Sequence, residues 1–190
     1  MTAVPVQQRM TADEFLAIPE GEGPRWQELV DGEVIVNEPD AVHNRVQGNL
    51  YLAIRLWMSA APNRGQVYTP IDVVMDESNV FAPDLCWYRP GSSMDVDAPA
   101  PYGRPDLAVE IRSPSTWRYD VGAKKSAYER LGLCELWLVD TPAREVLVFR
   151  RSTPAGERFD LSLELALGET VESPLLPAFG LKLNDLFDLA

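Results

Sequence analysis

The strongest constraint on the fold is a nearly continuous apolar run, DLAVEI at 106–111, in which Glu110 interrupts the apolar residues between Leu107 and Ile111. Apolar residues stand at nearly every position of this run, which is typical of a strand buried on both faces. In such a strand Leu107 and Val109 share one face, while Ala108 and Glu110 share the other. A buried carboxylate without a partner is costly. Glu110 therefore needs either a bound cation or a structural salt bridge to an arginine.

Other segments predict a mixture of strands and helices. Alternating apolar residues on both sides of Asp31-Gly32, a favoured two-residue turn, predict a β-hairpin at 26–37. Apolar residues at helical spacing predict helices over 43–61 and 120–132. Further expected elements are a short helix at 10–21 capped by Thr11 or Asp13 and ended by Pro19, one long strand at 66–75, strands at 84–88, 135–140 and 145–150, a surface loop at 89–105 and a closing helix at 179–187. The fold class is α/β, with a mixed sheet.

The length of 190 residues suits a single domain over 1–190, with its core at about residues 25–165. No apolar stretch reaches the roughly 18 residues of a membrane span, and the N-terminus MTAVPVQQRM lacks the features of a signal peptide. Cys86 and Cys134 both lie in apolar runs, which predicts buried thiols in a reducing compartment. We therefore expect a cytoplasmic protein without membrane association.

The formal net charge of −12 argues against a protein that binds nucleic acid by bulk electrostatics. The charges are unevenly spread, because no acidic residue lies between Asp40 and Asp72. A nuclease can carry excess acid in its metal site and confine its basic groups to one cleft, but ordinary solvated helix faces give the same pattern. The basic residues concerned are Arg45, Arg55, Arg64, Arg112, Arg118, Lys124, Lys125 and Arg130.

Three charged residues on separate elements carry the candidate chemistry. Asp84 opens a strand, Glu110 lies in the buried strand, and Lys124 lies in the helix at 120–132. Two carboxylates that meet at a sheet edge can hold a hard divalent cation. A lysine beside them can position an attacking water or stabilise charge on a phosphate. This set indicates a metal-dependent phosphodiesterase, although an aspartate next to Pro83 is also common in turns.

Helix geometry separates Lys124 from its neighbour Lys125. The residues three, four and seven positions after Lys124 form an apolar stripe, so this lysine is expected to point toward the sheet. Lys125 instead has Glu129 four residues on, which predicts an ion pair on the solvent face.

Four further residues are candidates for an auxiliary role. Glu28 in the first hairpin strand could supply another oxygen ligand, and Asp72 in the expected long strand could line the same cleft. Asp120, four residues before Lys124, could orient the lysine, but we expect it to cap the helix. His43, the only histidine, could contact a phosphate or transfer a proton, or could be a satisfied residue at a helix start. With no second histidine and no paired cysteines at ligand spacing, a zinc site is not expected, and the sequence has no glycine-rich phosphate loop or nucleophile elbow.

Five segments resemble, in order and spacing, the bacterial putative restriction endonuclease family, which belongs to the PD-(D/E)XK nuclease superfamily and is abundant in cyanobacteria and actinobacteria. They are WQELVDGEVIVNEP, AVHNRVQGNLY, PIDVVMDESNVFAPDLCWY, RPDLAVEIRSPST and DVGAKKSAYERLGLCELWLVD. The resemblance covers roughly residues 10–188, and SPST after the strand glutamate is its most specific part. It implies a restriction-endonuclease-like core, a mixed sheet flanked by helices, with Asp84 and Glu110 as metal-binding acids.

One position departs from the superfamily motif, which has a lysine two residues after the acid. Arg112 stands at that place here, and arginine stays charged and cannot act as a base. The resemblance implies that the lysine has moved to the following helix, at Lys124. It also implies Glu28 as an auxiliary acid.

The resulting hypothesis is an endonuclease that hydrolyses DNA with Mg²⁺ or Mn²⁺. Asp84, Glu110 and the carbonyl of Ile111 would hold the cation, and Lys124 would align water and help to deprotonate it. One alternative is a nuclease-fold binding or accessory module of a mobile element or defence system with little turnover. Another is a metal-dependent hydrolase that acts on a different substrate. DNA is the expected partner, and a homodimer would supply the two sites needed to cut both strands.

Overall fold

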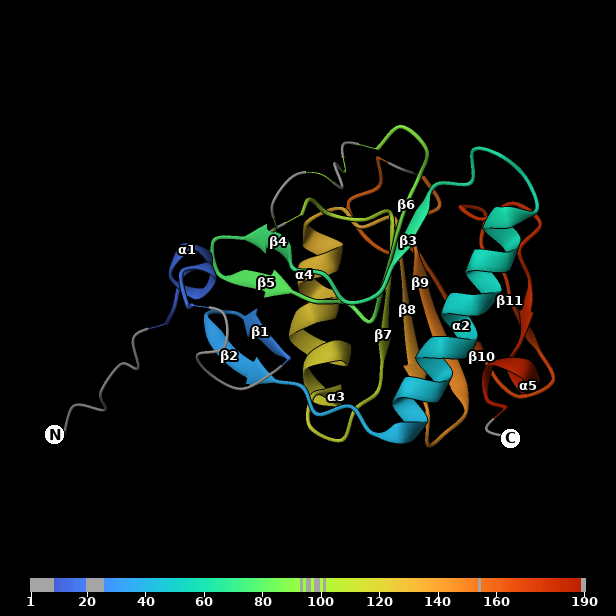
Figure 1. The fold of residues 1–190 in the computed structure, drawn as a ribbon, viewed down its shortest axis with the longest axis horizontal. Coiled ribbons are helices and arrows are strands. Elements are labelled where there is room, and N and C mark those ends of the chain that lie inside the picture. The colour runs from blue at the N-terminus through green and yellow to red at the C-terminus, as the bar shows by residue number, and fades with distance from the viewer. Residues whose placement is uncertain are drawn as a thin grey trace, which may run out of the picture.

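The computed structural model describes residues 9–19, 26–92, 94, 97, 100, 102–153 and 155–188. Its largest sheet is built from β3 (Gln66–Tyr68), β6 (Leu85–Tyr88), β7 (Leu107–Ile111), β8 (Glu135–Asp140), β9 (Glu145–Arg150) and β10 (Leu161–Leu165). The strands lie in the order β10-β9-β8-β7-β6-β3 (Figure 1). β7 and β8 pair parallel and the other neighbours pair antiparallel, so the sheet is mixed, as the sequence predicts.

Strand β7 lies inside this sheet and all of its residues are buried, which confirms the prediction from its apolar run. Helix α2 (Ala41–Ser59) covers one face of the sheet, where it packs with Val109. Helix α4 (Lys125–Arg130) covers the other face, where it packs with Ala108. The two helices therefore lie on opposite sides of the sheet (Figure 1), and Glu110 lies on the α4 side with Ala108.

A second sheet carries the N-terminal hairpin and lies beside α4 (Figure 1). Its strands are β1 (Gln27–Val30), β2 (Glu33–Val36), β4 (Val73–Asp76) and β5 (Asn79–Phe81), in the order β2-β1-β5-β4. The hairpin turn has positive φ at both central residues, 49° at Asp31 and 77° at Gly32, as a type I′ turn requires. Helix α1 (Ala12–Leu16) is capped by Thr11 through a capping box. Thr11 is one of the two residues that the sequence predicts as the cap.

The prediction of one long strand at 66–75 is wrong. Its two halves are β3 and β4, which belong to different sheets, and Pro70 lies in the break between them. Proline has no backbone N–H to donate to a ladder, so it ends a strand inside a sheet. Asp72 consequently lies just before β4 rather than within a strand.

The helix expected at 120–132 contains an unforeseen π-helical turn. This turn, η1 (Asp120–Lys124), follows the short helix α3 (Trp117–Tyr119) and leads into α4. Gly132 ends the helix with a φ of 81°, the conformation that favours glycine at this position. π-helical turns are rare and occur often at functional sites. The turn matters here because both Asp120 and Lys124 are buried within it.

The remaining described elements close the C-terminal side of the molecule. Helix α5 (Leu183–Leu186) confirms the closing helix and follows β12 (Leu181–Lys182), which pairs with β11 (Thr170–Val171). None of the helices in the described ranges has both the length and the apolar character needed to cross a lipid bilayer. Residues 1–8, where a signal peptide was considered, and six positions of the expected loop at 89–105 lie outside the described residues.

One buried acid of the large sheet has a purely structural setting. Glu135 is 0% exposed and accepts hydrogen bonds from Arg150 Nε at 2.8 Å, Trp137 Nε1 at 2.6 Å and Ser173 Oγ at 2.8 Å. All of these partners are hydrogen-bond donors, and Arg150 balances the charge of Glu135. Glu135 thus provides an internal standard for a carboxylate that only stabilises the fold.

Removing the guanidinium of Arg150, the charged partner of Glu135, is expected to lower the stability of the protein. Arg150→Ala leaves Glu135 buried without its charged partner, so we expect the free energy of unfolding to fall by about 3 kcal/mol. Arg158 is exposed, and Arg158→Ala is expected to change the same quantity by less than about 0.5 kcal/mol. Urea denaturation of the two variants measures both values, and equal stabilities would contradict the structural role of the pair.

A buried acidic cluster as candidate active site

The side chain of Lys124 lies at the centre of a cluster of acids inside the protein. Its ammonium nitrogen is 2.9 Å and 3.0 Å from the two carboxylate oxygens of Glu28 and 2.8 Å from Glu110 Oε1. The same nitrogen is 3.4 Å from Asp120 Oδ1, and Lys124 is only 1% exposed. The second sheet, the large sheet and the π-helical turn therefore meet at a single cation. The inward direction predicted for Lys124 from helix phase is confirmed.

Glu110 is held by two donors from the helical segment that α3, η1 and α4 form. Tyr128 Oη donates to Glu110 Oε1 at 2.6 Å, and Lys124 binds the same oxygen. Both partners differ from the arginine salt bridge that the sequence left open. The sequence placed Tyr128 in the apolar stripe, and only its hydroxyl group, which such patterns ignore, could have indicated the contact.

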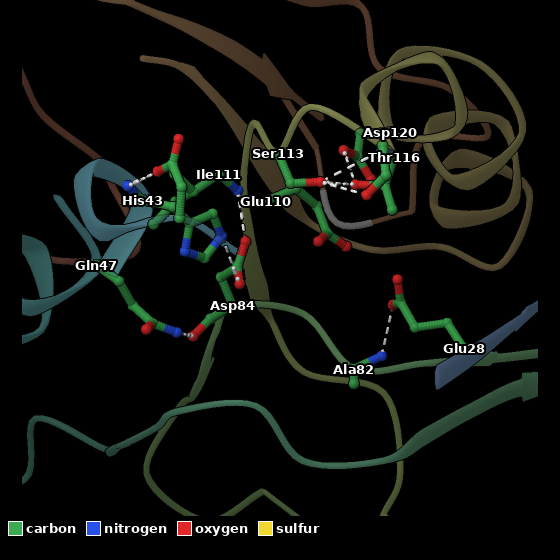
Figure 2. A network of polar contacts seen from close by, with 12 residues as sticks. Glu28, His43, Gln47, Ala82, Asp84, Glu110, Ile111, Ser113, Thr116 and Asp120 are labelled. Atoms are coloured by element: carbon green, nitrogen blue, oxygen red, sulfur yellow. Dashed lines mark hydrogen bonds and ion pairs between the residues drawn. The ribbon is translucent and has the colours of Figure 1, made fainter. Parts of the chain in front are cut away.

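Asp84 lies directly before β6, one step beyond the paired residues Leu85 and Val109, and so opposite Glu110. Its Oδ2 accepts a hydrogen bond from the backbone N–H of Ile111 at 2.7 Å (Figure 2). Continued by one residue, the antiparallel register puts Asp84 across from Glu110 at one end of β7, and the charge of Asp84 contributes to the raised pKa of Glu110.

Helix α2 positions Asp84 from the other side. His43 Nε2 lies 3.1 Å from Asp84 Oδ1, and Gln47 Nε2 donates to the Asp84 backbone carbonyl at 2.9 Å (Figure 2). His43 is 2% exposed. Burial alone would lower the pKa of His43, but the hydrogen bond and charge of Asp84, with the charge of Asp40, raise it. The structure thus joins His43 to the cluster, whereas Gln47 was not anticipated.

Asp120 does not cap a helix, so that prediction is wrong. The residue lies inside a continuous helical segment, and its Oδ2 accepts a hydrogen bond from Thr116 Oγ1 at 3.3 Å. Thr116 Oγ1 is in turn 2.8 Å from Ser113 Oγ (Figure 2). With its other oxygen near Lys124, Asp120 fits the second reading, in which it orients the lysine. The SPST segment supplies the hydroxyl groups that hold this carboxylate.

Two expectations about neighbouring residues have different outcomes. Asp72 is half-buried, and burial together with the charge of Glu28 raises the pKa of Asp72, but its place in the cleft stays a prediction. The expected ion pair of Lys125 with Glu129 is wrong. Lys125 Nζ lies 4.5 Å from the ring centre of Phe149, while Glu129 accepts a backbone hydrogen bond from the segment after β9. Lys125 still points away from the cluster.

Two of the basic residues form ion pairs with acids outside the cluster. Arg112 pairs with Asp140 at 2.8 Å, and Arg130 pairs with Asp76 at 3.2 Å. Arg112, which stands where the superfamily motif has lysine, is therefore bound to β8 and takes no part in the acidic cluster. These pairs favour ordinary surface roles for the two arginines.

The charges of the cluster are out of balance. Burial raises the pKa of Glu110 well above its ordinary value, Lys124 opposes this rise, and Glu28, Asp120 and Asp84 add to it. Burial likewise raises the pKa of Asp120 to about 6, against the effect of Lys124. Burial alone would lower the pKa of Lys124, but Glu110, Glu28 and Asp120 raise it well above its ordinary value. The cluster has more carboxylates than one ammonium can neutralise, and this excess of negative charge adds to the effect of burial on the pKa values of Glu110 and Asp120.

The donor chemistry of the cluster fits a hard divalent cation. Asp84 and Glu110 offer carboxylate oxygens at adjacent positions, and Mg²⁺ prefers oxygen ligands. Within the described ranges, no three carboxylate, imidazole or thiol side chains are arranged as a metal site. Two carboxylates are enough for Mg²⁺, because it keeps several of its waters. Burial is the first cause of the raised pKa values of Glu110 and Asp120, and a dication would oppose this rise as the charge of Lys124 does.

Comparison with known proteins identifies the family of this chain. The model of the Uma2 family, described as "Putative restriction endonuclease", matches residues 12–184. The chain belongs to the Uma2 family. A crystal structure of a putative nuclease belonging to DUF820 from Anabaena variabilis ATCC 29413 is similar to this Uma2 protein, with a TM-score of 0.75 and 20% sequence identity. The similarity covers 94% of this chain and 97% of that chain, and at this identity it shows the fold alone. No curated protein matches the chain.

Asp120 leads to a pH-dependent prediction. Its pKa is about 6 in the folded protein against an ordinary value of 3.8, so the folded state binds the proton more tightly and stability falls as the pH rises through this interval. Asp120→Asn replaces the carboxyl group with an amide, which stays neutral throughout this pH interval. We expect its free energy of unfolding to exceed that of the wild type by about 1–3 kcal/mol at pH 7, with the difference shrinking toward pH 4. Urea denaturation at several pH values without added metal tests this, and a difference independent of pH would refute it.

Proposed function

We propose that this Uma2 protein is a divalent-metal-dependent endonuclease that hydrolyses phosphodiester bonds of DNA. The observation that carries the proposal is the buried cluster around Lys124, in which acids from two sheets exceed the available positive charge. Asp84 and Glu110 would hold Mg²⁺ or Mn²⁺, with the backbone carbonyl of Ile111 as a further ligand. When bound, the cation would act as a Lewis acid toward the phosphate and its leaving oxygen.

Lys124 is assigned an electrostatic role. Its raised pKa keeps the ammonium protonated, which suits a group that holds a water molecule and stabilises charge on the phosphoryl oxygens. A protonated lysine is a poor base, so the water would lose its proton to a carboxylate of the cluster. Glu28 and Asp120 fix the position of Lys124, and Glu28 also accepts a hydrogen bond from the backbone N–H of Ala82 at 2.7 Å.

One observation favours a second function, an accessory or binding module with little turnover. Lys124 is 1% exposed and surrounded by carboxylates, as a purely structural ion network would be. In that case the acids would stabilise the fold in the way that Glu135 does. The difference between the two sites is the balance of charge: Glu135 is paired with Arg150, whereas three carboxylates share the single ammonium of Lys124.

A plasmid-nicking assay with Mg²⁺ tests the catalytic proposal. Asp84→Asn keeps the size of the side chain but removes its charge, and we expect cleavage to fall to background. Lys124→Met keeps most of the buried volume, and we expect a loss of roughly 10²–10³-fold in rate, because the ammonium acts mainly in the transition state.

The matched control is Lys125→Ala, which changes the adjacent lysine outside the cluster. We expect its rate to stay within about 3-fold of the wild type, since Lys125 lies over Phe149 and contacts none of the acids. Circular dichroism confirms that each variant is folded. Equal loss in Lys124→Met and Lys125→Ala would point to general attraction of DNA, and wild-type protein inactive with both Mg²⁺ and Mn²⁺ would favour the accessory module.

Metal binding can be measured separately from cleavage. A cation that binds the folded protein raises its melting temperature in proportion to the logarithm of its concentration. We expect Mg²⁺ and Mn²⁺ to stabilise the wild type and to have little effect on Asp84→Asn. If Asp84→Asn were stabilised as strongly as the wild type, Asp84 would not be a ligand.

A further inference from the structure

A cavity opens directly beside the acidic cluster. It has a volume of about 270 Å³ and lies between the open end of the β1–β2 hairpin, the first turns of α2 and the segments around Pro70 and Ala82. Glu28, His43 and Asp84 line this cavity and also belong to the cluster. Larger hollows elsewhere on the protein contain none of these acids. A ligand in the 270 Å³ cavity would therefore lie against the proposed catalytic groups.

Trp26 at the mouth of the cavity is held in an unusual way. Its φ of 59° is in the left-handed region, which is an outlier for a bulky residue, and its side chain is 57% exposed. The Asn37 backbone N–H donates to the Trp26 carbonyl at 2.8 Å, so the end of the hairpin ladder fixes this conformation. Backbone strain of this kind occurs mostly where a ligand is bound or a reaction occurs. An exposed indole at a cavity mouth offers a flat surface for stacking.

Asn37 adds a second observation that points to a ligand. Its Oδ1 is buried in the wall of the cavity and has no hydrogen-bond partner among the described residues. A buried polar atom without a partner costs free energy, and a ligand that donates a hydrogen bond would remove that cost. Pro39 and Pro70 supply apolar surface on the same cavity. The lining thus combines a flat aromatic ring, apolar walls and an unused polar atom.

We infer that this cavity binds one unpaired nucleobase of the DNA substrate, next to the phosphodiester bond that is cleaved. A flipped or single-stranded base is held by stacking on aromatic or apolar side chains and by hydrogen bonds to its edge. Trp26 supplies the stacking surface and Asn37 the edge contact. The volume is slightly below the roughly 300–1,000 Å³ typical of ligand pockets, which suits one base rather than a larger ligand. This inference rests on the proposed nuclease function and specifies its substrate.

The inference has a consequence for substrate choice. A base inside a duplex is stacked and paired on all sides, so it reaches the cavity only after it leaves the helix, at a cost of a few kcal/mol. A base that is already unpaired avoids this cost. The protein should therefore prefer single-stranded, bulged or mismatched DNA over fully paired DNA of the same sequence.

Three fluorescein-labelled 21-base-pair probes separate contacts with the base from contacts with the backbone. One carries a single bulged adenine, the second carries a bulged abasic nucleotide at the same place, and the third is fully paired. Binding is measured by fluorescence anisotropy with Ca²⁺, which leaves the proposal independent of turnover. We expect the wild type to bind the adenine bulge roughly 5- to 150-fold more tightly than the abasic bulge, as stacking of one base on an aromatic ring supplies.

Trp26→Ala should remove the preference for the adenine bulge, and Trp26→Phe should retain part of it because the ring remains aromatic. Asn37→Ala should reduce the preference, because the base loses its edge contact. Leu163→Ala, at a 41% exposed position on β10 of the other sheet, is the matched control and should bind all probes as the wild type does. Thermal melts confirm that the variants are folded.

The outcomes separate this inference from the nuclease proposal. Equal wild-type affinity for the adenine and abasic bulges, or an unchanged preference in Trp26→Ala, would overturn the nucleobase site even if the protein cleaves DNA with Mg²⁺. A preference for adenine that depends on Trp26 would support the site even if Mg²⁺-dependent cleavage is absent, and in that case only the nuclease proposal fails.

Discussion

The arrangement of this protein depends on one shared cation, the buried ammonium of Lys124. It contacts Glu28 of the second sheet, Glu110 of the large sheet and Asp120 of the preceding turn, and without it these acids would be buried together. The ammonium therefore links two sheets that otherwise form separate layers on either side of the helical segment. Because taking charges out of water is expensive, such a network is retained only where its geometry is good or its chemistry is needed. In the function proposed above, the surplus of acid corresponds to the second of these reasons.

Local patterns predicted most of the fold. The type I′ hairpin, the buried strand β7 and the long helix α2 follow from turn residues, an unbroken apolar run and helical spacing, which act over a few neighbouring residues. The failures also have local causes. Pro70 divides an apparently continuous strand between two sheets, and short strands such as β5 have too few residues to show a period. The π-helical turn has no sequence pattern that distinguishes it from an ordinary helical turn.

For the candidate site, the sequence predicted some of the residues and missed others. Glu110 could be singled out because a carboxylate interrupts a buried run, and Lys124 because helix phase turns it toward the sheet. Asp120 was misread because a helix start was assumed where helical structure is already continuous from α3. Tyr128 and Gln47 contribute hydroxyl and amide groups whose partners lie 18 and 37 residues away in the sequence, and only packing of the complete chain reveals such pairs. Sequence alone therefore finds the acids of the cluster and Lys124, but not the hydroxyl and amide donors that hold the acids.

The contact between Lys124 and Glu28 spans 96 residues of the chain. A contact of such long range closes a large loop, and bringing its two ends together has an entropic cost. A growing or partly unfolded chain has β1, β7 and the helical segment only as separate pieces, with the acids exposed to water and not assembled around a common cation. The hydrolytic chemistry proposed for the cluster would then be silent during synthesis and would start only when both sheets are packed. If the protein cleaves DNA as proposed, this delay would confine cleavage to chains that have folded completely.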